Sequence, residues 1–589
     1  MPRTAQPQAQ LESTNTDIAK PRLTKLIIKN YRSIGPTPVE IELDEIVILV
    51  GPNNVGKSSI LKAYELAMSQ GSSKASLQLE DFPNCQIDPT NLPEIEIHTV
   101  VYDETVGDKW IDSVSGEKIV REKWVWSGVG APKRYGWDTT LNEDVGGWSE
   151  NVPWGAPNVA NSKRPEAHRI DAFASPDEQA KAIQTLLSKA LTERVKNIGD
   201  HETHGTNYAA LLDQIKQLQK NIVSDAQEEI DTVNGELSAL VSKVFPGYKI
   251  DFDAKPEDQL DKTINLFKAD SQLLMGPEGG HMSTIDKQGS GARRTLLWTA
   301  IKFIAENAKV TGSAQEARPN LLLIDEPEIC LHPGAIRDAC KALYELPDTG
   351  RWQVMATTHS PIFIDFSKDN TTIVRVEKGD SGDVKGTTVF RPSSAQLDSD
   401  DKANLKLLNI ADPYVAEFFF GGKTVIVEGD TEYTAFSYVR SKHPELYADV
   451  HIIRARGKAT IRSLVKILNH FANDYAVLHD SDTPLRSDGG ANSAWTTNQL
   501  ILDAVNDKPE EIEVRLLASL PNFEGAYFGT APASEKPYAA LKAVMDSEEN
   551  FNKIKSLLDA LIDFSKPVPE NCVEWTDLNS LRQSIESLA

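Results

Sequence analysis

The sequence predicts an α/β protein made of two domains in which short strands alternate with helices. One buried strand run, Ile46–Val50, leads through a glycine-rich loop into a helix. Four further short apolar strands recur between Thr424 and Leu517. Strand–helix alternation implies a largely parallel sheet with ligands at the carboxyl ends of its strands. With 589 residues the chain exceeds the size of one hydrophobic core, so at least two domains are expected.

Composition indicates a globular protein from a reducing compartment, the cytoplasm. The apolar and charged fractions, 40% and 25%, are ordinary. The 4 cysteines lie far apart without CxxC spacing, which argues against disulfides and against a zinc site. No run of about 18 apolar residues appears, so no membrane span is expected. The net charge of −24 argues against a broad DNA-binding surface, so any basic stripe must be local.

Residue patterning divides the chain into segments. Residues 1–20 are polar and lack an apolar core, so a disordered tail is expected there. The other expected segments are an α/β domain in two parts (residues 21–175 and 266–395), a helical insert between them (176–265), a polar linker (396–421) and a second α/β domain (422–589).

The insert carries one stripe of apolar or small residues at steps of three or four, which is typical of a long helix or a helical hairpin. The stripe consists of Leu211, Ile215, Leu218, Ile222, Ala226, Ile230, Val233, Leu237, Leu240 and Val244. Such a stripe packs either on its own domain or on a second copy as a dimerisation arm, and its width does not decide between the two.

The glycine-rich loop has the complete G-x4-G-K-[ST] pattern between a strand and a helix. Its glycines let backbone N–H groups surround phosphate oxygens, Lys57 reaches the β- and γ-phosphates, and Ser58 offers a hydroxyl to Mg²⁺. The nucleotide-binding residues expected here are Gly51, Asn53, Asn54, Gly56, Lys57, Ser58 and Ser59. The loop therefore predicts a magnesium–nucleotide site.

Two later strands bring further residues to this site. The aliphatic run Leu321–Ile324 ends in Asp325, which is expected in the magnesium shell, and Glu326, which is expected to activate the attacking water. The strand Gln353–Ala356 is followed closely by His359. A single histidine is more often a packed or capping residue. In this order, however, His359 resembles the γ-phosphate-sensing histidine of ABC ATPases.

Two other segments resemble parts of ABC-type heads. Lys287–Arg294 opens an apolar helix and resembles the signature loop, although it departs from the common LSGGQ form. The resemblance places Ser290 on nucleotide bound to the opposite subunit and so implies a dimer or larger. Leu26–Ile34 resembles the first strand of DNA-repair and SMC-type heads, in which the position of Arg32 lies close to nucleotide.

Carboxylates follow two strands of the second domain. Thr424–Val427 ends in Glu428, and Ala476–Leu478 is followed by Asp480 and Asp482. The ends of such strands adjoin, so these three side chains are expected to converge. Crowded carboxylates raise each other's pKa unless cations are present, and hard oxygen ligands suit Mg²⁺ or Mn²⁺. A single acid of this kind is usually a solvated loop residue, but the ordered set predicts metal-dependent phosphodiester chemistry.

Three more residues belong to this expected site. Glu432 ends the Glu428–Glu432 segment and is counted among the metal ligands. Glu524, after the strand Val514–Leu517, would complete a second metal site, and Lys536 would neutralise charge on the pentavalent phosphate.

An ABC-type head followed by this acid pattern, which is similar to Toprim, resembles the overcoming-lysogenisation-defect (OLD) family of nucleases. The resemblance covers Leu23 to about Leu541 and rests on the nucleotide motifs, Thr358–Pro361, Val427–Glu432, Gly457-Lys458, Asp480-x-Asp482, Phe523-Glu524 and Lys536-Pro537. It implies an ABC-type P-loop ATPase head with a helical dimerisation insert, followed by a Toprim domain.

The same resemblance implies ATP and Mg²⁺ or Mn²⁺ as cofactors, cleavage of DNA, a homodimer or larger assembly, and a frequent role in bacterial or phage defence. It favours the dimerisation arm for the helical stripe. Members of the family act alone or beside a helicase-like protein or a reverse-transcriptase/RNA system, and nothing in the sequence selects among these.

Three other functions use parts of the pattern. An ATP-switched DNA clamp would keep the Toprim domain as a non-cleaving scaffold, and the intact acid set argues against it. A topoisomerase needs a tyrosine-bearing cleavage domain, for which too little chain follows the acids. A primase has no use for an ABC head. The sequence therefore predicts a metal-dependent DNA endonuclease with ATPase activity.

Overall fold

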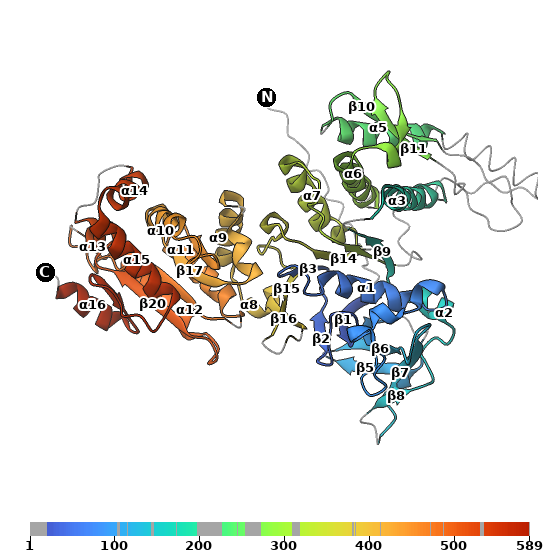
Figure 1. The fold of residues 1–589 in the computed structure, drawn as a ribbon, viewed down its shortest axis with the longest axis horizontal. Coiled ribbons are helices and arrows are strands. Elements are labelled where there is room, and N and C mark those ends of the chain that lie inside the picture. Colours follow the sequence, from blue (N-terminus) through green and yellow to red (C-terminus); the bar gives the residue numbers. More distant parts are fainter. Residues whose placement is uncertain are drawn as a thin grey trace, which may run out of the picture.

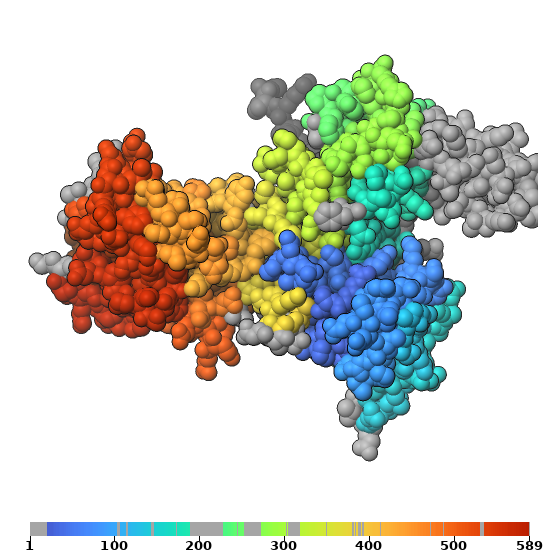
Figure 2. Space-filling model, in the orientation of Figure 1, coloured from blue at the N-terminus to red at the C-terminus, as the bar shows by residue number. Residues whose placement is uncertain are grey.

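The computed structural model describes residues 21–587, apart from residues 103–105, 115, 143–145, 172–173, 197–226, 244, 254–271, 309–318, 351, 380–381, 383, 413, 472, 487 and 530–534. Figure 1 shows an N-terminal part, called the head below, and a C-terminal part, called the C-terminal lobe. The two are joined through the yellow and orange segments of the chain, as the space-filling view in Figure 2 also shows.

The centre of the head is a six-stranded sheet with the order β16-β15-β3-β14-β13-β9. Its strands are β3 (Ile46–Val50), β9 (Glu166–Ile170), β13 (Asn320–Ile324), β14 (Trp352–Thr357), β15 (Thr371–Lys378) and β16 (Val384–Phe390). All pairs are parallel except β15–β16. Every residue of β3, β13 and β14 is buried, as expected for parallel strands covered on both faces.

Different layers cover the two faces of this sheet. Val47 and Leu49 share a core with helix α1 (Lys57–Met68) and with an antiparallel sheet. Ile46 and Ile48 share a second core with α6 (Ser290–Ala308) and α7 (Pro333–Glu345). Because all five strands that end near the phosphate loop are parallel, their carboxyl ends form one edge, and the predicted nucleotide residues lie along it.

The antiparallel sheet of the head has the order β2-β1-β4-β6-β7-β8, with β5 paired to β6. Its strands are β1 (Arg22–Lys29), β2 (Val39–Glu42), β4 (Glu94–Val100), β5 (Ile111–Val114), β6 (Glu117–Val125), β7 (Lys133–Asp138) and β8 (Gly147–Ser149), and the short helix α2 (Pro157–Ser162) follows them. Side chains along β4 alternate between buried and partly exposed, so one face of the sheet packs on the core.

The segment predicted as a helical insert contains strands as well as helices. Helices α3 (Pro176–Lys196) and α5 (Gln227–Ser242) confirm its helical character, but β10 (Tyr248–Asp253) pairs with β11 (Gln272–Pro277), which pairs with β12 (Ser283–Thr284). The stripe predicted helix as far as Val244, close to the end of α5, but the segment 176–265 also contains the strand β10, which the sequence did not predict. The helical periodicity ends with α5, and the alternation Tyr-Lys-Ile-Asp-Phe-Asp that follows has the period of a strand.

The apolar stripe of the insert is only partly described. Ile230, Val233 and Leu237 of α5 are buried in the core of the head, so this portion packs on its own domain. Leu240 of α5 is partly buried. The remaining stripe positions, Leu211, Ile215, Leu218, Ile222, Ala226 and Val244, lie outside the described residues.

The C-terminal lobe is built on a five-stranded sheet with the order β18-β17-β19-β20-β21. The four strands predicted from the sequence are β17 (Lys423–Val427), β18 (Val450–Arg454), β19 (Tyr475–Asp480) and β20 (Val514–Ser519), all parallel, and β21 (Cys572–Glu574) is antiparallel. The helices are α10 (Asp430–Lys442), α11 (Lys458–Leu468), α12 (Ser493–Asn506), α13 (Phe523–Phe528), α14 (Lys536–Asp546), α15 (Glu548–Ile562) and α16 (Leu578–Glu586).

The stretch expected to be a polar linker is folded. It forms α9 (Ser399–Ala411) and a 3-10 segment, Val415–Phe420, and the short helix α8 (Pro392–Ala395) precedes it. Asp398 caps α9 by accepting hydrogen bonds from the backbone N–H groups of Asp400 and Asp401, so the aspartates that suggested a linker start a helix. The proposed domain boundaries at residues 395 and 421 stay predictions.

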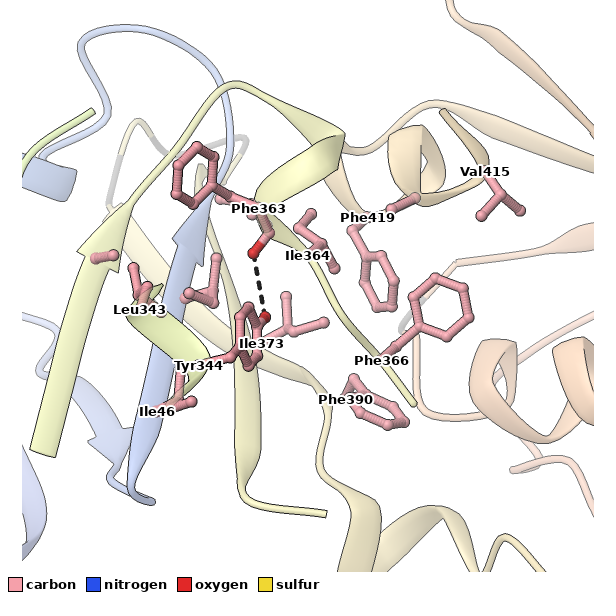
Figure 3. Packing of buried hydrophobic residues seen from close by; sticks show 14 of the residues in the cluster. Ile46, Leu343, Tyr344, Phe363, Ile364, Phe366, Ile373, Phe390, Val415 and Phe419 are labelled. Atoms are coloured by element: carbon pink, nitrogen blue, oxygen red, sulfur yellow. Dashed lines mark hydrogen bonds between the residues drawn. The ribbon is translucent and has the colours of Figure 1, made fainter. Parts of the chain in front are cut away.

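An aromatic cluster joins the head to the C-terminal lobe. Phe366 and Phe390 come from the head, Phe418 and Phe419 from the 3-10 segment, and Phe471 from the lobe. Phe419 has ring contacts with the other four, at centroid distances of 4.4 to 6.2 Å. Figure 3 shows Phe366, Phe390 and Phe419 packed between the two parts. The two parts are therefore held together by a continuous hydrophobic core.

Replacing Phe419 with alanine is expected to lower the free energy of unfolding by about 3–5 kcal/mol, because a fully buried ring is removed and a cavity remains. Urea denaturation of the whole chain measures this. The control is Leu407→Ala on α9, whose side chain is 66% exposed and whose loss should cost less than about 0.5 kcal/mol. Equal midpoints for the two variants would show that the cluster does not hold the parts together.

No helix among the described residues is long and apolar enough to cross a membrane.

Candidate nucleotide and metal sites

The phosphate loop adopts a conformation that its two glycines permit. Gly51 has φ 136°, and a Cβ there would lie 2.0 Å from the Val376 carbonyl oxygen, so only glycine fits between β3 and β15. Gly56 has φ 99°, and a Cβ there would lie 2.6 Å from Ser33 Oγ. The loop is thus confined on both sides before it enters α1.

Lys57 lies inside this loop. Its Nζ donates to the carbonyl oxygens of Gly51 and Pro52, at 2.9 and 2.7 Å. Burial lowers the pKa of Lys57, and the nearby carboxylates of Glu326 and Asp325 act in the opposite direction. Asn53, Asn54 and Ser58 are exposed around the loop, whereas Ser59 is buried in α1.

The end of β13 faces the start of α1. Ser58 Oγ lies 3.1 Å from Asp325 Oδ1, and Thr357 Oγ1 at the end of β14 donates to the same oxygen at 2.5 Å. A serine hydroxyl beside an aspartate is the pair that holds Mg²⁺ in P-loop proteins. These residues therefore fit a magnesium ion bound with nucleotide.

Glu326 and His359 are neighbours. His359 Nε2 lies 3.6 Å from Glu326 Oε1, and Glu326 has φ 44°, a left-handed conformation that is strained for this residue type. Burial, then the adjacent Asp325, raises the pKa of Glu326. Burial and the charge of Lys57 lower the pKa of His359. An acid with a raised pKa beside a neutral imidazole suits proton transfer near neutral pH.

The other two predicted nucleotide residues lie differently. Ser33, next to Arg32, touches the loop at Gly56, but the Arg32 guanidinium forms an ion pair with Asp81 at 2.9 Å. Ser290 is exposed at the first residue of α6, and no interaction among the described residues joins it to the phosphate loop. The side chains that lie together at the phosphate loop are Lys57, Ser58, Asp325, Glu326 and His359. Ser290 lies apart from them.

In the C-terminal lobe, Glu428 and Asp480 lie at the carboxyl ends of β17 and β19. Glu428 Oε2 accepts from the Asp480 N–H at 3.0 Å, and Asp480 Oδ1 accepts from the Phe523 N–H at 2.8 Å. Glu432 accepts from the Gly429 N–H at 3.1 Å at the start of α10. Backbone N–H groups therefore fix these carboxylates in place.

The other two acids of the site, Asp482 and Glu524, each form an ion pair with a lysine. Lys458 Nζ, buried at the start of α11, forms an ion pair with Asp482 and donates to Asn498 Oδ1 at 2.9 Å. Lys536 Nζ lies 3.1 Å from Glu524 Oε1. All six residues predicted for this site thus lie at one edge of the sheet.

The pKa values show how strongly these acids interact. Burial raises the pKa of Asp480 to about 8, with further contributions from Glu432 and Glu428. Burial and the charges of Glu428 and Glu524 raise the pKa of Glu432 to about 7. Burial also raises the pKa of Glu428, against the opposite effect of Lys458. A cation would favour the ionised form of each.

The donor set fits a divalent ion, although no ready-made cluster is present. Among the described residues, no three His, Cys, Asp or Glu side chains have the arrangement of a metal site. Contacts nevertheless bring the carboxylates together, because Glu428 accepts from the Asp480 N–H at 3.0 Å and Thr431, next to Glu432, lies 3.4 Å from Glu524 Oε1. Carboxylate oxygens are the donors that Mg²⁺ or Mn²⁺ prefers, so these residues would hold the ion.

Several residues that support these sites have roles that only the structure shows. Thr357 and Glu328 tie the His359 segment to the end of β13, and Lys458 and Asn498 hold Asp482. Lys458 belongs to the Gly457-Lys458 pair that carries the resemblance, and its position was also open to inference, because it follows β18 as Glu428 follows β17 and parallel strands end at one edge. Asn498 carries no such signal, since it lies within α12 far from any strand end.

Comparison with known proteins assigns both parts of the chain. Residues 22–134 and 158–364, more than half of the chain, match the AAA ATPase domain family, and residues 419–482 match the overcoming lysogenization defect protein-like TOPRIM domain. The chain therefore belongs to the OLD family, with an AAA ATPase domain joined to an OLD-like TOPRIM domain.

Three curated relatives cover most of the chain. The Old nuclease of Escherichia phage P2 is 23% identical over 490 residues, 78% of this chain and 77% of the relative. The OLD nuclease of Thermus scotoductus (strain ATCC 700910 / SA-01) is 22% identical over 571 residues, 93% of this chain and 100% of the relative. Endonuclease GajA of Bacillus cereus (strain VD045) is 21% identical over 479 residues, 78% and 75% of the two chains.

Solved heads of SMC proteins overlap with the chain at low scores. An Smc head bound to the C-winged helix domain of ScpA has a TM-score of 0.36 at 16% identity, over 62% of this chain and 97% of that one. The SMC head domain from Thermotoga maritima has a TM-score of 0.31 at 12% identity, over 63% and 99%.

Proposed function

We propose that this protein is an ATP-hydrolysing, divalent-metal-dependent DNA endonuclease of the OLD type that acts in anti-phage defence as a homodimer or larger assembly. One observation carries the proposal. Four mutually interacting carboxylates and Lys536 lie at the strand ends of the C-terminal lobe, in the same chain as a complete phosphate-loop site. The nuclease names of the three relatives support it.

In the head, each residue has a distinct task. The loop N–H groups and Lys57 would hold the β- and γ-phosphates, and Ser58 and Asp325, 3.1 Å apart, would hold the magnesium ion. Glu326 accepts a proton from the attacking water, and its raised pKa brings it nearer to the operating pH. His359, 3.6 Å from Glu326, is placed to contact the γ-phosphate.

Glu326→Gln is expected to keep ATP binding and to lower the rate of hydrolysis by about 100-fold or more, since an amide keeps the shape but accepts no proton. Phosphate release under saturating ATP measures the rate. ATP trapped in this way should hold two heads together through Ser290, so light scattering should show a dimer that requires ATP. Glu345→Gln on α7 is the control. Normal turnover by Glu326→Gln would remove Glu326 from this role.

In the lobe, a divalent ion bound by the carboxylates would supply an activated water and a Lewis acid for the phosphodiester. The chain's own residues prepare this site. Backbone N–H groups orient Glu428 and Asp480, Lys458 holds Asp482, and Lys536 beside Glu524 can neutralise charge on the phosphate that develops during cleavage.

The decisive experiment incubates the purified protein with supercoiled, linear and single-stranded DNA, with Mg²⁺ or Mn²⁺, and with or without ATP. Nicked or linear plasmid that appears only with metal supports the nuclease. Binding without cleavage under every condition would instead favour the ATP-switched DNA clamp, in which the Lys458–Asp482 ion pair would keep the lobe closed to metal.

A further inference from the structure

Glu328 connects the two segments that carry the residues proposed for ATP hydrolysis. It follows Glu326 by two residues at the end of β13, and its side chain reaches the segment after β14. Glu328 Oε1 accepts from the His359 backbone N–H at 2.6 Å and from Thr358 Oγ1 at 2.9 Å. A single carboxylate oxygen therefore fixes the backbone on which His359 is carried.

Thr357 makes a second set of hydrogen bonds between the end of β13 and the end of β14. Thr357 Oγ1 accepts from the Glu326 N–H at 3.0 Å and donates to Asp325 at 2.5 Å. The strand ends β13 and β14 are thus joined by hydrogen bonds on both sides of Glu326, whose left-handed φ of 44° needs such support. Without the Glu328 contacts, the β13–β14 backbone pairing and the Thr357 contacts would remain, and neither involves the His359 N–H.

We propose that Glu328 is a positioning residue for ATP hydrolysis, which holds the backbone of His359 so that its imidazole stays beside Glu326. The inference rests on the proposed ATPase function of the head. Glu328 need not touch nucleotide, because its acceptor oxygen is engaged by His359 and Thr358, and Oε2 is buried with no hydrogen-bond partner among the described residues.

The two oxygens of Glu328 make the test selective. Glutamine keeps an acceptor in the place of Oε1 and puts its amide nitrogen where Oε2 has no partner. Alanine removes the acceptor and leaves the His359 N–H and the Thr358 hydroxyl without one. A role in positioning therefore predicts that Glu328→Gln works and Glu328→Ala does not, whereas a role for the negative charge predicts that both fail.

Steady-state ATP hydrolysis is measured for Glu328→Ala, Glu328→Gln and Thr358→Val in the full chain. For Glu328→Ala we expect kcat to fall by about 100-fold, the loss typical of misplaced reacting groups, with KM for ATP changed less than about 3-fold. Glu328→Gln should stay within about 3-fold of the parent. Thr358→Val removes one of the two contacts and should lower kcat by about 5-fold. Adding Thr358→Val to Glu328→Ala should lower kcat by less than the same change does in the parent, because only the contacts of the Thr358 hydroxyl with Ser360, whose N–H lies at 2.9 Å, remain to be lost.

Amide hydrogen exchange gives a readout that does not depend on turnover. The peptide Thr357–Ile362 contains the His359 N–H, which should lose protection in Glu328→Ala and keep it in Glu328→Gln. Glu345→Ala on α7, whose only ion pair is with Lys341 among the described residues, is the matched control. If Glu328→Ala does not fold, Glu328→Gln and Thr358→Val carry the test.

Three results would overturn the inference: normal kcat in Glu328→Ala, a change confined to KM, or a loss in Glu328→Gln as large as in Glu328→Ala. A parent protein that does not hydrolyse ATP would instead contradict the proposed ATPase function. In that case exchange at His359 alone decides whether Glu328 holds this segment.

Discussion

Lys57→Ala is expected to abolish tight ATP binding and hydrolysis. Lys57 Nζ lies within hydrogen-bond distance of two loop carbonyls and is the cation that the loop itself supplies to the β- and γ-phosphates. Truncating one partner of a buried charge pair costs about 2–5 kcal/mol, so the affinity for ATP should fall by about 30-fold or more. Fluorescence titration with a labelled ATP analogue and a phosphate-release assay measure the two effects.

The matched control is Lys62→Ala, which removes a lysine from the same helix, where it pairs with Glu65 at 2.8 Å. This variant should bind and hydrolyse ATP as the parent does. Thermal melting without nucleotide should give similar midpoints for both variants. Hydrolysis at the parental rate by a folded Lys57→Ala protein would show that the loop Gly51–Ser58 is not the nucleotide site.

Glu428→Ala, or the pair Asp480→Ala and Asp482→Ala, is expected to eliminate DNA cleavage while ATP hydrolysis stays largely intact. Each alanine removes a hard oxygen ligand from a site that must bind a strongly hydrated ion. The loss of DNA cleavage is expected to leave ATP hydrolysis intact because the two sites lie on different sheets. The carboxylates lie on the β18-β17-β19-β20-β21 sheet, and the phosphate loop lies on the other parallel sheet. Plasmid nicking after chelation and metal add-back, beside phosphate release, measures the two activities.

Glu445→Ala is the control for this prediction, because Glu445 is an exposed acid of the same lobe, away from the strand ends. A modest change in the ATPase rate is compatible with contact between the two parts through the aromatic cluster. Full-rate cleavage by folded Glu428→Ala after metal add-back would place the nuclease centre elsewhere and contradict the assignment of the carboxylates.

Local pattern was sufficient to predict both parallel sheets and most of the residues at their edges. The phosphate loop, the run before Asp325 and the strand before Glu428 are each buried apolar segments that end in polar residues. In a parallel sheet the end of a strand is also an end of the sheet, so position in the sequence translates directly into position at the site. Residues at strand ends were therefore predictable.

The pattern of apolar and polar residues did not predict elements whose packing or pairing partners lie far away in the sequence. The strand β10 has its pairing partner in β11, beyond a long intervening stretch, and the polar residues before α9 were taken for a linker although they cap a helix that packs on α11. Composition identifies polar residues but not the surface against which they pack.

The sequence by itself determined the two candidate sites, since the phosphate loop is one complete local motif and the carboxylates follow the ends of successive strands. Only the tertiary structure decided how those motifs are held: Lys458 on Asp482, Glu328 on His359, and the phenylalanines between head and lobe. The physical reason is the range of the interactions. Loop geometry follows from neighbouring φ and ψ angles, whereas a buried ion pair or aromatic contact joins residues that only the folded chain brings together.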